Sequence, residues 1–377
     1  MHESTTAANT AVLVSLDLGA PDYAESLEEF RLLVESAGVQ SVALVAGKRQ
    51  KPDPKLFAGS GKVEEIASMV EELEVPLVIF NHDLSPSQMR NLAAALNARV
   101  IDRTMLILDI FALRAQSHEG KVQVELAQLK YLSTRLAGMN QDMGQQKYAV
   151  GARGPGETQL ELDKRKLDNR VVLLKERLEK LRKHRQVLRK SRDRSEVLSV
   201  SIVGYTNAGK STLFNKMTHA NVYVADQLFA TLDTTARRVF IEGTGQVVLS
   251  DTVGFIRHLP HGLVAAFRST LEETAMADLL LHVVDANSSE RHDQVAEVNK
   301  VLHEIGADKI PQILIYNKID LQDLPAHVKR DEYGRIVSIN LSAKTGAGVD
   351  ELRGALAEVR DTHKQEDQVQ EWHPLNN

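Results

Sequence analysis

The chain has 377 residues and a formal net charge of −5, with 43% hydrophobic and 26% charged residues, which is typical of a soluble globular protein with two domains and a connector. It contains no cysteine, which excludes disulfides, thiolate zinc sites and cysteine nucleophiles. No apolar run approaches the roughly 18 residues of a membrane span, and the first residues lack a signal-peptide pattern, so we expect a cytoplasmic protein with no membrane partner.

Apolar runs alternate with helical patterns over the first hundred residues. The apolar runs are AVLVSLDL, SVALVAGKR, PLVIFNH and ARVIDR, and the helical patterns between them are YAESLEEFRLLVESAG, KVEEIASMVEELE and SPSQMRNLAAALN. The last begins with Ser85 and Pro86, which fit a helix N-cap and a first helical position. Strands that alternate with helices predict a parallel α/β domain, which we place at residues 1–105.

Residues 106–197 show a helical period instead. One stripe of a first helix carries Val122, Leu126, Leu129 and Leu136. After a glycine-rich stretch, Val171 and Leu178 alternate with leucines that recur every seven residues: Leu160, Leu167, Leu174, Leu181 and Leu188. This period predicts a long, coiled-coil-like helical hairpin that links two domains and has the glycine segment at its tip.

Residues 198–362 again alternate strands and helices, and residues 363–377 form a polar tail. GYTNAGKS, residues 204–211, fits the phosphate-loop pattern G-x-x-x-x-G-K-[ST] between a strand pattern and a helix pattern. The glycines let backbone N–H groups curve around phosphates, and the helix N-terminus adds positive potential. We expect Lys210 to bridge the β- and γ-phosphates and the Ser211 hydroxyl to bind Mg²⁺.

Three later segments each end a predicted strand. VVLSDTVGF supplies Asp251 for Mg²⁺ and Gly254, whose N–H can meet the γ-phosphate. ILIYNKID ends in Asp320, whose carboxylate can accept hydrogen bonds from N1 and N2 of guanine, which adenine cannot offer. INLSAKTG supplies a second base contact. The four segments together predict a translation-factor-type GTPase domain with a mainly parallel sheet, which binds GTP and GDP.

Switch I should lie between the phosphate loop and Asp251, where Thr231, Thr234 and Thr235 are candidates for the Mg²⁺ and γ-phosphate contact. We choose Thr231, because LFATL, residues 228–232, resembles the PFTTL of Obg-type GTPases, and we expect the other two threonines to cap a turn. The predicted metal ligands are thus Ser211, Thr231 and Asp251, and the predicted catalytic residues are Lys210, Thr231 and Gly254. The predicted nucleotide-binding residues are Gly204, Tyr205, Thr206, Asn207, Ala208, Gly209, Lys210, Ser211, Thr212, Phe229, Ala230, Thr231, Leu232, Asp233, Asp251, Thr252, Val253, Gly254, Asn317, Lys318, Ile319, Asp320, Ser342, Ala343 and Lys344.

Phe255 follows Gly254, at the place where Ras-like GTPases carry the glutamine that orients the attacking water. Phenylalanine cannot hydrogen-bond water, so we expect hydrolysis to be slow until a partner orders the switches. Asn207 resembles the asparagine of potassium-stimulated GTPases, which makes K⁺ a candidate second cofactor beside Mg²⁺.

The whole chain resembles the HflX family of ribosome-associated GTPases. The resemblance is carried by FAGSGKVEEI in the first domain, by EGKVQVELAQLKYL in the linker, and above all by GARGPGETQLELDKRKL at the predicted hairpin tip. It implies binding to the large (50S) ribosomal subunit and its 23S RNA, with the tip directed toward the peptidyl transferase centre. It also implies splitting of stalled 70S ribosomes under stress such as heat. The first domain shows no visible catalytic set, and we interpret it as a ribosome-contacting and switch-regulating element.

The second hairpin helix is strongly basic, with 14 Lys/Arg against 4 Asp/Glu from Lys164 to Arg194, so it can bind an RNA backbone. Our RNA-binding candidates are Arg153, Lys164, Arg165, Lys166, Arg182, Lys183 and Arg185. Two alternatives stay open: a GTPase of ribosome assembly or RNA remodelling, and a regulatory GTPase that uses the hairpin as a coiled-coil interface for a protein. A monomer is the default for a factor that enters the inter-subunit space.

Overall fold

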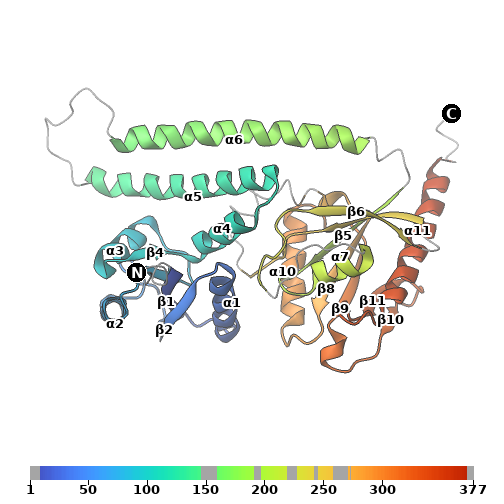
Figure 1. The fold of residues 1–377 in the computed structure, drawn as a ribbon, viewed down its shortest axis with the longest axis horizontal. Helices are drawn as coiled ribbons and strands as arrows, with labels where there is room; N and C mark the ends of the chain where they lie inside the picture. Colours follow the sequence, from blue (N-terminus) through green and yellow to red (C-terminus); the bar gives the residue numbers. More distant parts are fainter. Residues whose placement is uncertain are drawn as a thin grey trace, which may run out of the picture. The chain divides into compact units, whose positions relative to one another are not determined.

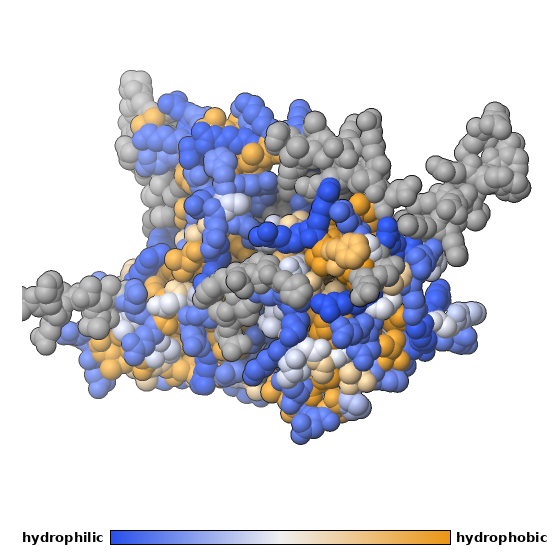
Figure 2. All heavy atoms as spheres, turned by 45° about the vertical axis from the view of Figure 1, so that its right-hand side comes forward, coloured by the Kyte–Doolittle hydropathy of each residue, from blue (hydrophilic) through white to orange (hydrophobic). Residues whose placement is uncertain are grey.

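The computed structural model describes residues 9–145, 159–190, 197–218, 227–241, 245–257, 271 and 273–371. The chain divides into two compact units, residues 1–181 and 182–377 (Figure 1). In the ranges described, no helix combines the length and hydrophobicity needed to cross a membrane. On the face drawn in Figure 2, hydrophobic residues are interspersed with hydrophilic ones.

The first unit begins with a four-stranded parallel sheet in the order β2-β1-β3-β4, as its alternating pattern predicts. The strands are β1 (Thr10–Asp17), β2 (Gln40–Lys48), β3 (Leu77–Phe80) and β4 (Arg99–Ile101). The helices are α1 (Tyr23–Ser36), α2 (Ser60–Glu72), α3 (Pro86–Leu96) and α4 (Arg103–Arg114). Ser85 caps α3 in a capping box with Gln88, and Pro86 takes the first helical position, which confirms the predicted start of this helix.

The hairpin helices are α5 (His118–Gln145) and α6 (Gln159–Lys190), which run side by side in Figure 1. Val122 and Leu126 of α5 pack against Leu174 of α6, with Leu129, Val171 and Leu178 partly buried around them. The two helices follow one another in the chain and run side by side in opposite directions, so they form the antiparallel hairpin that the period of seven predicts. The side chains of Leu136, Leu160 and Leu188 lie outside the described residues.

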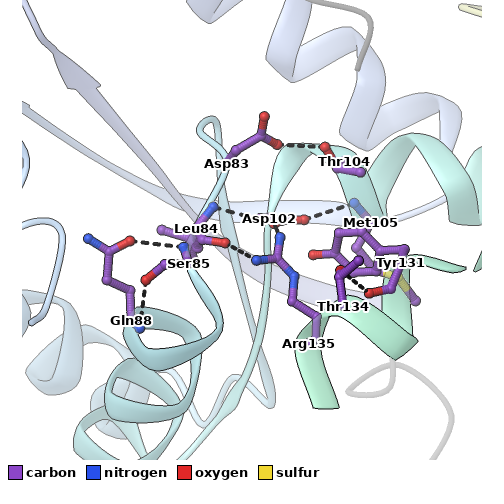
Figure 3. Close-up of polar contacts among 10 residues, drawn as sticks. All are labelled: Asp83, Leu84, Ser85, Gln88, Asp102, Thr104, Met105, Tyr131, Thr134 and Arg135. Atoms are coloured by element: carbon purple, nitrogen blue, oxygen red, sulfur yellow. Dashed lines mark hydrogen bonds and ion pairs between the residues drawn. The ribbon is translucent and has the colours of Figure 1, made fainter. Parts of the chain in front are cut away.

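A buried ion pair joins α5 to the sheet domain (Figure 3). The fully buried Asp102 caps α4 by accepting a hydrogen bond from Met105 N at 2.9 Å, and it pairs with Arg135 of α5 at 2.7 Å. Arg135 also donates to the carbonyl oxygen of Leu84 and lies 4.5 Å from the ring centroid of Tyr131. Burial raises the pKa of Asp102, so a charged partner is needed to keep this carboxylate ionised. The contact fixes α5 on the sheet domain through a residue in the C-terminal half of this helix.

The second unit contains a seven-stranded sheet in the order β10-β11-β9-β8-β5-β7-β6. Its strands are β5 (Leu198–Gly204), β6 (Thr235–Ile241), β7 (Gly245–Asp251), β8 (Leu279–Asp285), β9 (Gln312–Asn317), β10 (His327–Arg330) and β11 (Ile336–Asn340). Only the outer pairs, β6 with β7 and β10 with β11, are antiparallel among the paired strands described. The sheet is therefore mainly parallel, as predicted.

Among the described residues that follow β5, the helices are α7 (Lys210–Thr218), α10 (Arg291–Glu304) and α11 (Val349–Glu371), with short 3₁₀ helices η3 (Thr274–Met276) and η4 (Ile319–Leu321). Phe214 of α7 and Leu352 of α11 are fully buried in one core cluster with Ile202 of β5, while α10 contacts β5 and β8. Helix α11 continues through residues that the sequence assigns to a polar tail. The parallel strands β5, β7, β8 and β9 end at one edge of the sheet, which is where ligands bind in sheets of this kind.

His282 makes the stability of this unit depend on pH. The side chain is buried in β8, and this burial is the main reason why its pKa falls from 6.5 to about 4. In the unfolded chain His282 therefore binds a proton at a higher pH than in the folded chain. Its full contribution to the free energy of unfolding is present above pH 6.5, and this contribution is lost as the pH falls from 6.5 toward 4. We expect a loss of about 2 kcal/mol from this group at pH 5.

Urea unfolding followed by circular dichroism at pH 7.5 and pH 5 would measure this loss. In the H282Q variant, the part of the pH dependence due to residue 282 should disappear, whereas H292Q, at an exposed position, should behave like the wild type. Equal pH dependence in the wild type and H282Q would contradict the assignment.

Candidate nucleotide-binding site

The phosphate loop connects β5 to α7 with backbone geometry that demands glycine at two positions. Gly204 has φ +148°, and a Cβ atom there would lie 2.2 Å from the carbonyl oxygen of Val283. Gly209 has φ +92°, and its Cβ would lie 2.2 Å from Nδ2 of Asn317. Both contacts are too short for any side chain, so the loop can approach β8 and β9 only with these glycines. The backbone N–H groups that open α7 then lie beside the loop, where an anion can bind.

Lys210 is a buried cation at the start of α7. Its Nζ donates a hydrogen bond to the carbonyl oxygen of Tyr205 at 2.7 Å and lies 3.0 Å from the position that a Cβ of Gly254 would occupy. Burial lowers the pKa of Lys210 to about 8, against the opposing effect of Asp251. A phosphate would supply the negative charge that a buried ammonium group requires.

Ser211, Thr231 and Asp251 converge, although they come from three segments. Ser211 Oγ lies 2.7 Å from Thr231 Oγ1 and donates to Asp251 Oδ2 at 2.6 Å, and Thr231 Oγ1 donates to the same oxygen at 3.1 Å. Burial raises the pKa of Asp251, and its Oδ1 has no hydrogen-bond partner among the described residues. Two hydroxyls and a carboxylate with a spare buried oxygen are the hard ligands that Mg²⁺ prefers. Of the three switch I threonines, the structure brings Thr231 to this point, whereas Thr235 begins β6.

Asn317 connects the two segments that the sequence predicts to bind the base with the phosphate loop. Its Nδ2 donates to the carbonyl oxygen of Ala208 at 2.9 Å, and its Oδ1 accepts from Ala343 N at 2.9 Å. Asp320 lies in η4, and its buried Oδ1 has no hydrogen-bond partner among the described residues. The segment after β9 therefore offers an unsatisfied carboxylate oxygen, which is the kind of acceptor that a guanine base can use.

The remaining predicted site residues take the following positions. Tyr205–Gly209 form the loop, Thr212 lies in the first turn of α7, Phe229–Asp233 precede β6, Thr252–Gly254 follow β7, Lys318 and Ile319 follow β9, and Ser342–Lys344 follow β11. The RNA candidates Lys164, Arg165, Lys166, Arg182 and Lys183 lie on α6, mostly exposed. Arg153 and the Arg185 side chain lie outside the described residues.

Two site contacts involve residues that sequence reasoning missed. Asp285, at the end of β8, forms an ion pair with Lys318 at 2.8 Å, and its place at a strand end could have signalled this role. Arg257 donates its backbone N–H to the Tyr205 hydroxyl at 2.8 Å, and its guanidinium pairs with Glu290 at 2.8 Å. No local pattern marks Arg257, because its partners lie far away in the sequence.

The phosphate loop, the strand-end carboxylates and the sheet order define a P-loop GTPase domain. Family models agree: "GTP-binding GTPase N-terminal" matches residues 24–112, "GTP-binding GTPase Middle Region" matches 114–192, and "50S ribosome-binding GTPase" matches 199–318. GTPase HflX of Escherichia coli strain K12 is 52% identical over 359 residues, which cover 95% of this chain and 84% of that protein. GTPase HflX of Caldanaerobacter subterraneus is 45% identical, over 94% of this chain and 82% of that protein.

This chain therefore belongs to the HflX family of GTPases, and it hydrolyses GTP. Among solved structures, a GTP-binding protein from the archaeon Sulfolobus solfataricus in complex with GDP is 25% identical, with a TM-score of 0.50 over 94% of this chain and 99% of that chain. The resemblance drawn from the sequence motifs is thereby confirmed.

Proposed function

We propose that the chain binds GTP and GDP at the carboxyl edge of the seven-stranded sheet and acts on the large ribosomal subunit. The phosphate loop and Lys210 hold the phosphates, Gly254 meets the γ-phosphate, and Asp320 with residues 342–344 holds guanine. The observation that carries this assignment is the convergence of Ser211, Thr231 and Asp251 beside the loop. The hydroxyl of Thr231, our switch I candidate, lies within hydrogen-bond distance of both other candidate ligands, which supports the proposal.

The same three residues hold Mg²⁺ in this proposal. Bound there, Mg²⁺ neutralises phosphate charge during hydrolysis. Potassium at Asn207 is a further part of the proposal, supported by the exposed position of this residue in the loop at φ +58°. If the rate of GTP turnover is the same in Na⁺ and in K⁺, potassium is not a cofactor of this protein.

The ribosome is the proposed partner because a basic helix accompanies the GTPase site in one chain. Exposed cations of α6 bind the phosphate backbone of 23S RNA. The match to a family model described as a 50S ribosome-binding GTPase supports the large subunit. In this proposal, GTP stabilises the conformation of the protein that binds the ribosome. The energy of this binding separates the subunits of stalled 70S ribosomes under stress. GTP hydrolysis then permits release of the protein.

Sucrose gradients of 70S ribosomes, mixed with stoichiometric protein, test this function. With GTP or with a non-hydrolysable analogue, we expect the 70S peak to be converted into 50S and 30S peaks, because splitting depends on binding alone. Splitting with GTP only would refute the proposed order of events. An unchanged 70S peak with both nucleotides would refute the splitting function and would favour a role on precursor particles.

A further inference from the structure

The residue after Gly254 is held away from any role in orienting water. Phe255 is only 2% exposed, and its backbone pairs with the phosphate loop. Its N–H donates to the carbonyl oxygen of Gly204 at 3.2 Å, and its carbonyl oxygen accepts from Thr206 N at 2.8 Å. A group that orients the attacking water must therefore come from another position.

Thr206 is the side chain that this pairing places against Gly254. A Cβ added to Gly254 would lie 2.7 Å from Cγ2 and 3.0 Å from Cα of Thr206, and 3.0 Å from Nζ of Lys210. Thr206, Gly254 and Lys210 therefore share one corner of the site. Two of these three residues are the ones that we assign to the γ-phosphate.

The hydroxyl of Thr206 has no hydrogen-bond partner among the described residues, although the side chain is buried, with 6% exposed. A buried hydroxyl without a partner destabilises the folded state, and valine would fill the same volume without this cost. An unsatisfied group of this kind needs an explanation, and a ligand that supplies the missing hydrogen bond is one.

We propose that Thr206 is a catalytic residue of GTP hydrolysis, whose hydroxyl binds the attacking water beside the γ-phosphate. This proposal rests on the placement of the γ-phosphate given above. Thr206 Oγ1 accepts a hydrogen bond from the water and thereby directs a lone pair of the water oxygen toward phosphorus. As the new P–O bond forms, the bond to the β–γ bridging oxygen breaks, its electron pair leaves with GDP, and a water proton passes to the phosphate product. Thr206 is unchanged at the end of the cycle.

Single-turnover hydrolysis by the full-length protein without ribosomes tests the proposal with T206V and T206S. T206V keeps the shape and removes the hydroxyl, so we expect the rate constant to fall about tenfold or more. T206S keeps the hydroxyl and should remain within about threefold of the wild type. Fluorescent GDP should bind all three proteins equally, and T206V should unfold at the same or a higher urea concentration.

The matched control is T274V, which alters another buried threonine of the same unit, one that accepts a hydrogen bond from Ser201; its hydrolysis rate should match the wild type. The proposal is overturned if T206V hydrolyses GTP at the wild-type rate. It is also overturned if T206S, which keeps the hydroxyl, loses as much activity as T206V, because the hydroxyl would then not account for the loss. A different result would contradict the proposed nucleotide site itself. In that case K210A would bind fluorescent GTP and GDP as tightly as the wild type.

Discussion

The D320N variant is expected to lose about a hundredfold in affinity for GTP and to gain affinity for xanthosine triphosphate. A carboxylate accepts two hydrogen bonds from N1 and N2 of guanine, whereas an asparagine amide presents one acceptor and one donor. Xanthine has a carbonyl oxygen at C2 in place of the amino group of guanine, so it can accept a hydrogen bond from the amide N–H that the substitution introduces. The buried Oδ1 of Asp320 has no hydrogen-bond partner among the described residues, so this carboxylate has an acceptor available for the base.

Competition of the two triphosphates against fluorescent GDP measures the exchange of specificity. D323N is the matched control, because Asp323 is an exposed carboxylate three positions further along the same connection. This control should bind both nucleotides like the wild type. If D320N and the wild type discriminated equally between guanine and xanthine, Asp320 could not be the base-reading residue.

Neutralising three cations at the start of α6 is expected to weaken binding to 50S subunits about a hundredfold near physiological salt. The variant K164Q/R165Q/K166Q removes the charges of residues that lie at or near the surface of α6. Each lost phosphate contact also removes the release of counterions, so the slope of log affinity against log salt should become shallower by about two to three.

The matched control removes three exposed lysines of the GTPase unit, in the variant K300Q/K309Q/K329Q. It lowers the net charge by the same amount, so it separates a local contact from general electrostatic attraction. Unequal losses, with the larger in the α6 variant, would support RNA contact by this helix. Equal losses of affinity would show that net charge alone explains the effect. Binding that resists ribonuclease would indicate a protein partner.

Much of the fold follows from local patterns in the sequence. The capping box at Ser85 is a contact over three residues, and the leucines around Leu174 repeat at a fixed period, so each can be predicted without knowledge of distant parts. The phosphate loop has a local motif as well, because Gly204 and Gly209 both adopt positive φ there, although the close approach that they permit is to β8 and β9. The roles of the individual site residues stay predictions until nucleotide binding is measured.

Contacts between distant segments were beyond the reach of such patterns. The Asp102–Arg135 ion pair joins the sheet domain to the hairpin. The backbone N–H of Arg257 donates a hydrogen bond to the hydroxyl of Tyr205, which lies 52 positions earlier in the chain. Nor does any motif reveal that the Thr206 hydroxyl is buried without a partner among the described residues, because burial depends on the whole fold. The domain bounds of 1–105, 106–197 and 198–362 also stay a proposal, since the two compact units divide the chain within α6.

GTP turnover measured with no partner, with 50S subunits, with 30S subunits and with 70S ribosomes tests whether the large ribosomal subunit is the partner, with ATP as a comparison substrate. We expect slow turnover by the protein alone, strong acceleration by 50S and 70S but not by 30S, and no turnover of ATP. Acceleration is expected because Phe255 leaves the site without the glutamine of Ras-like enzymes. Turnover that is the same with all three particles as without them would contradict the assignment to the ribosome.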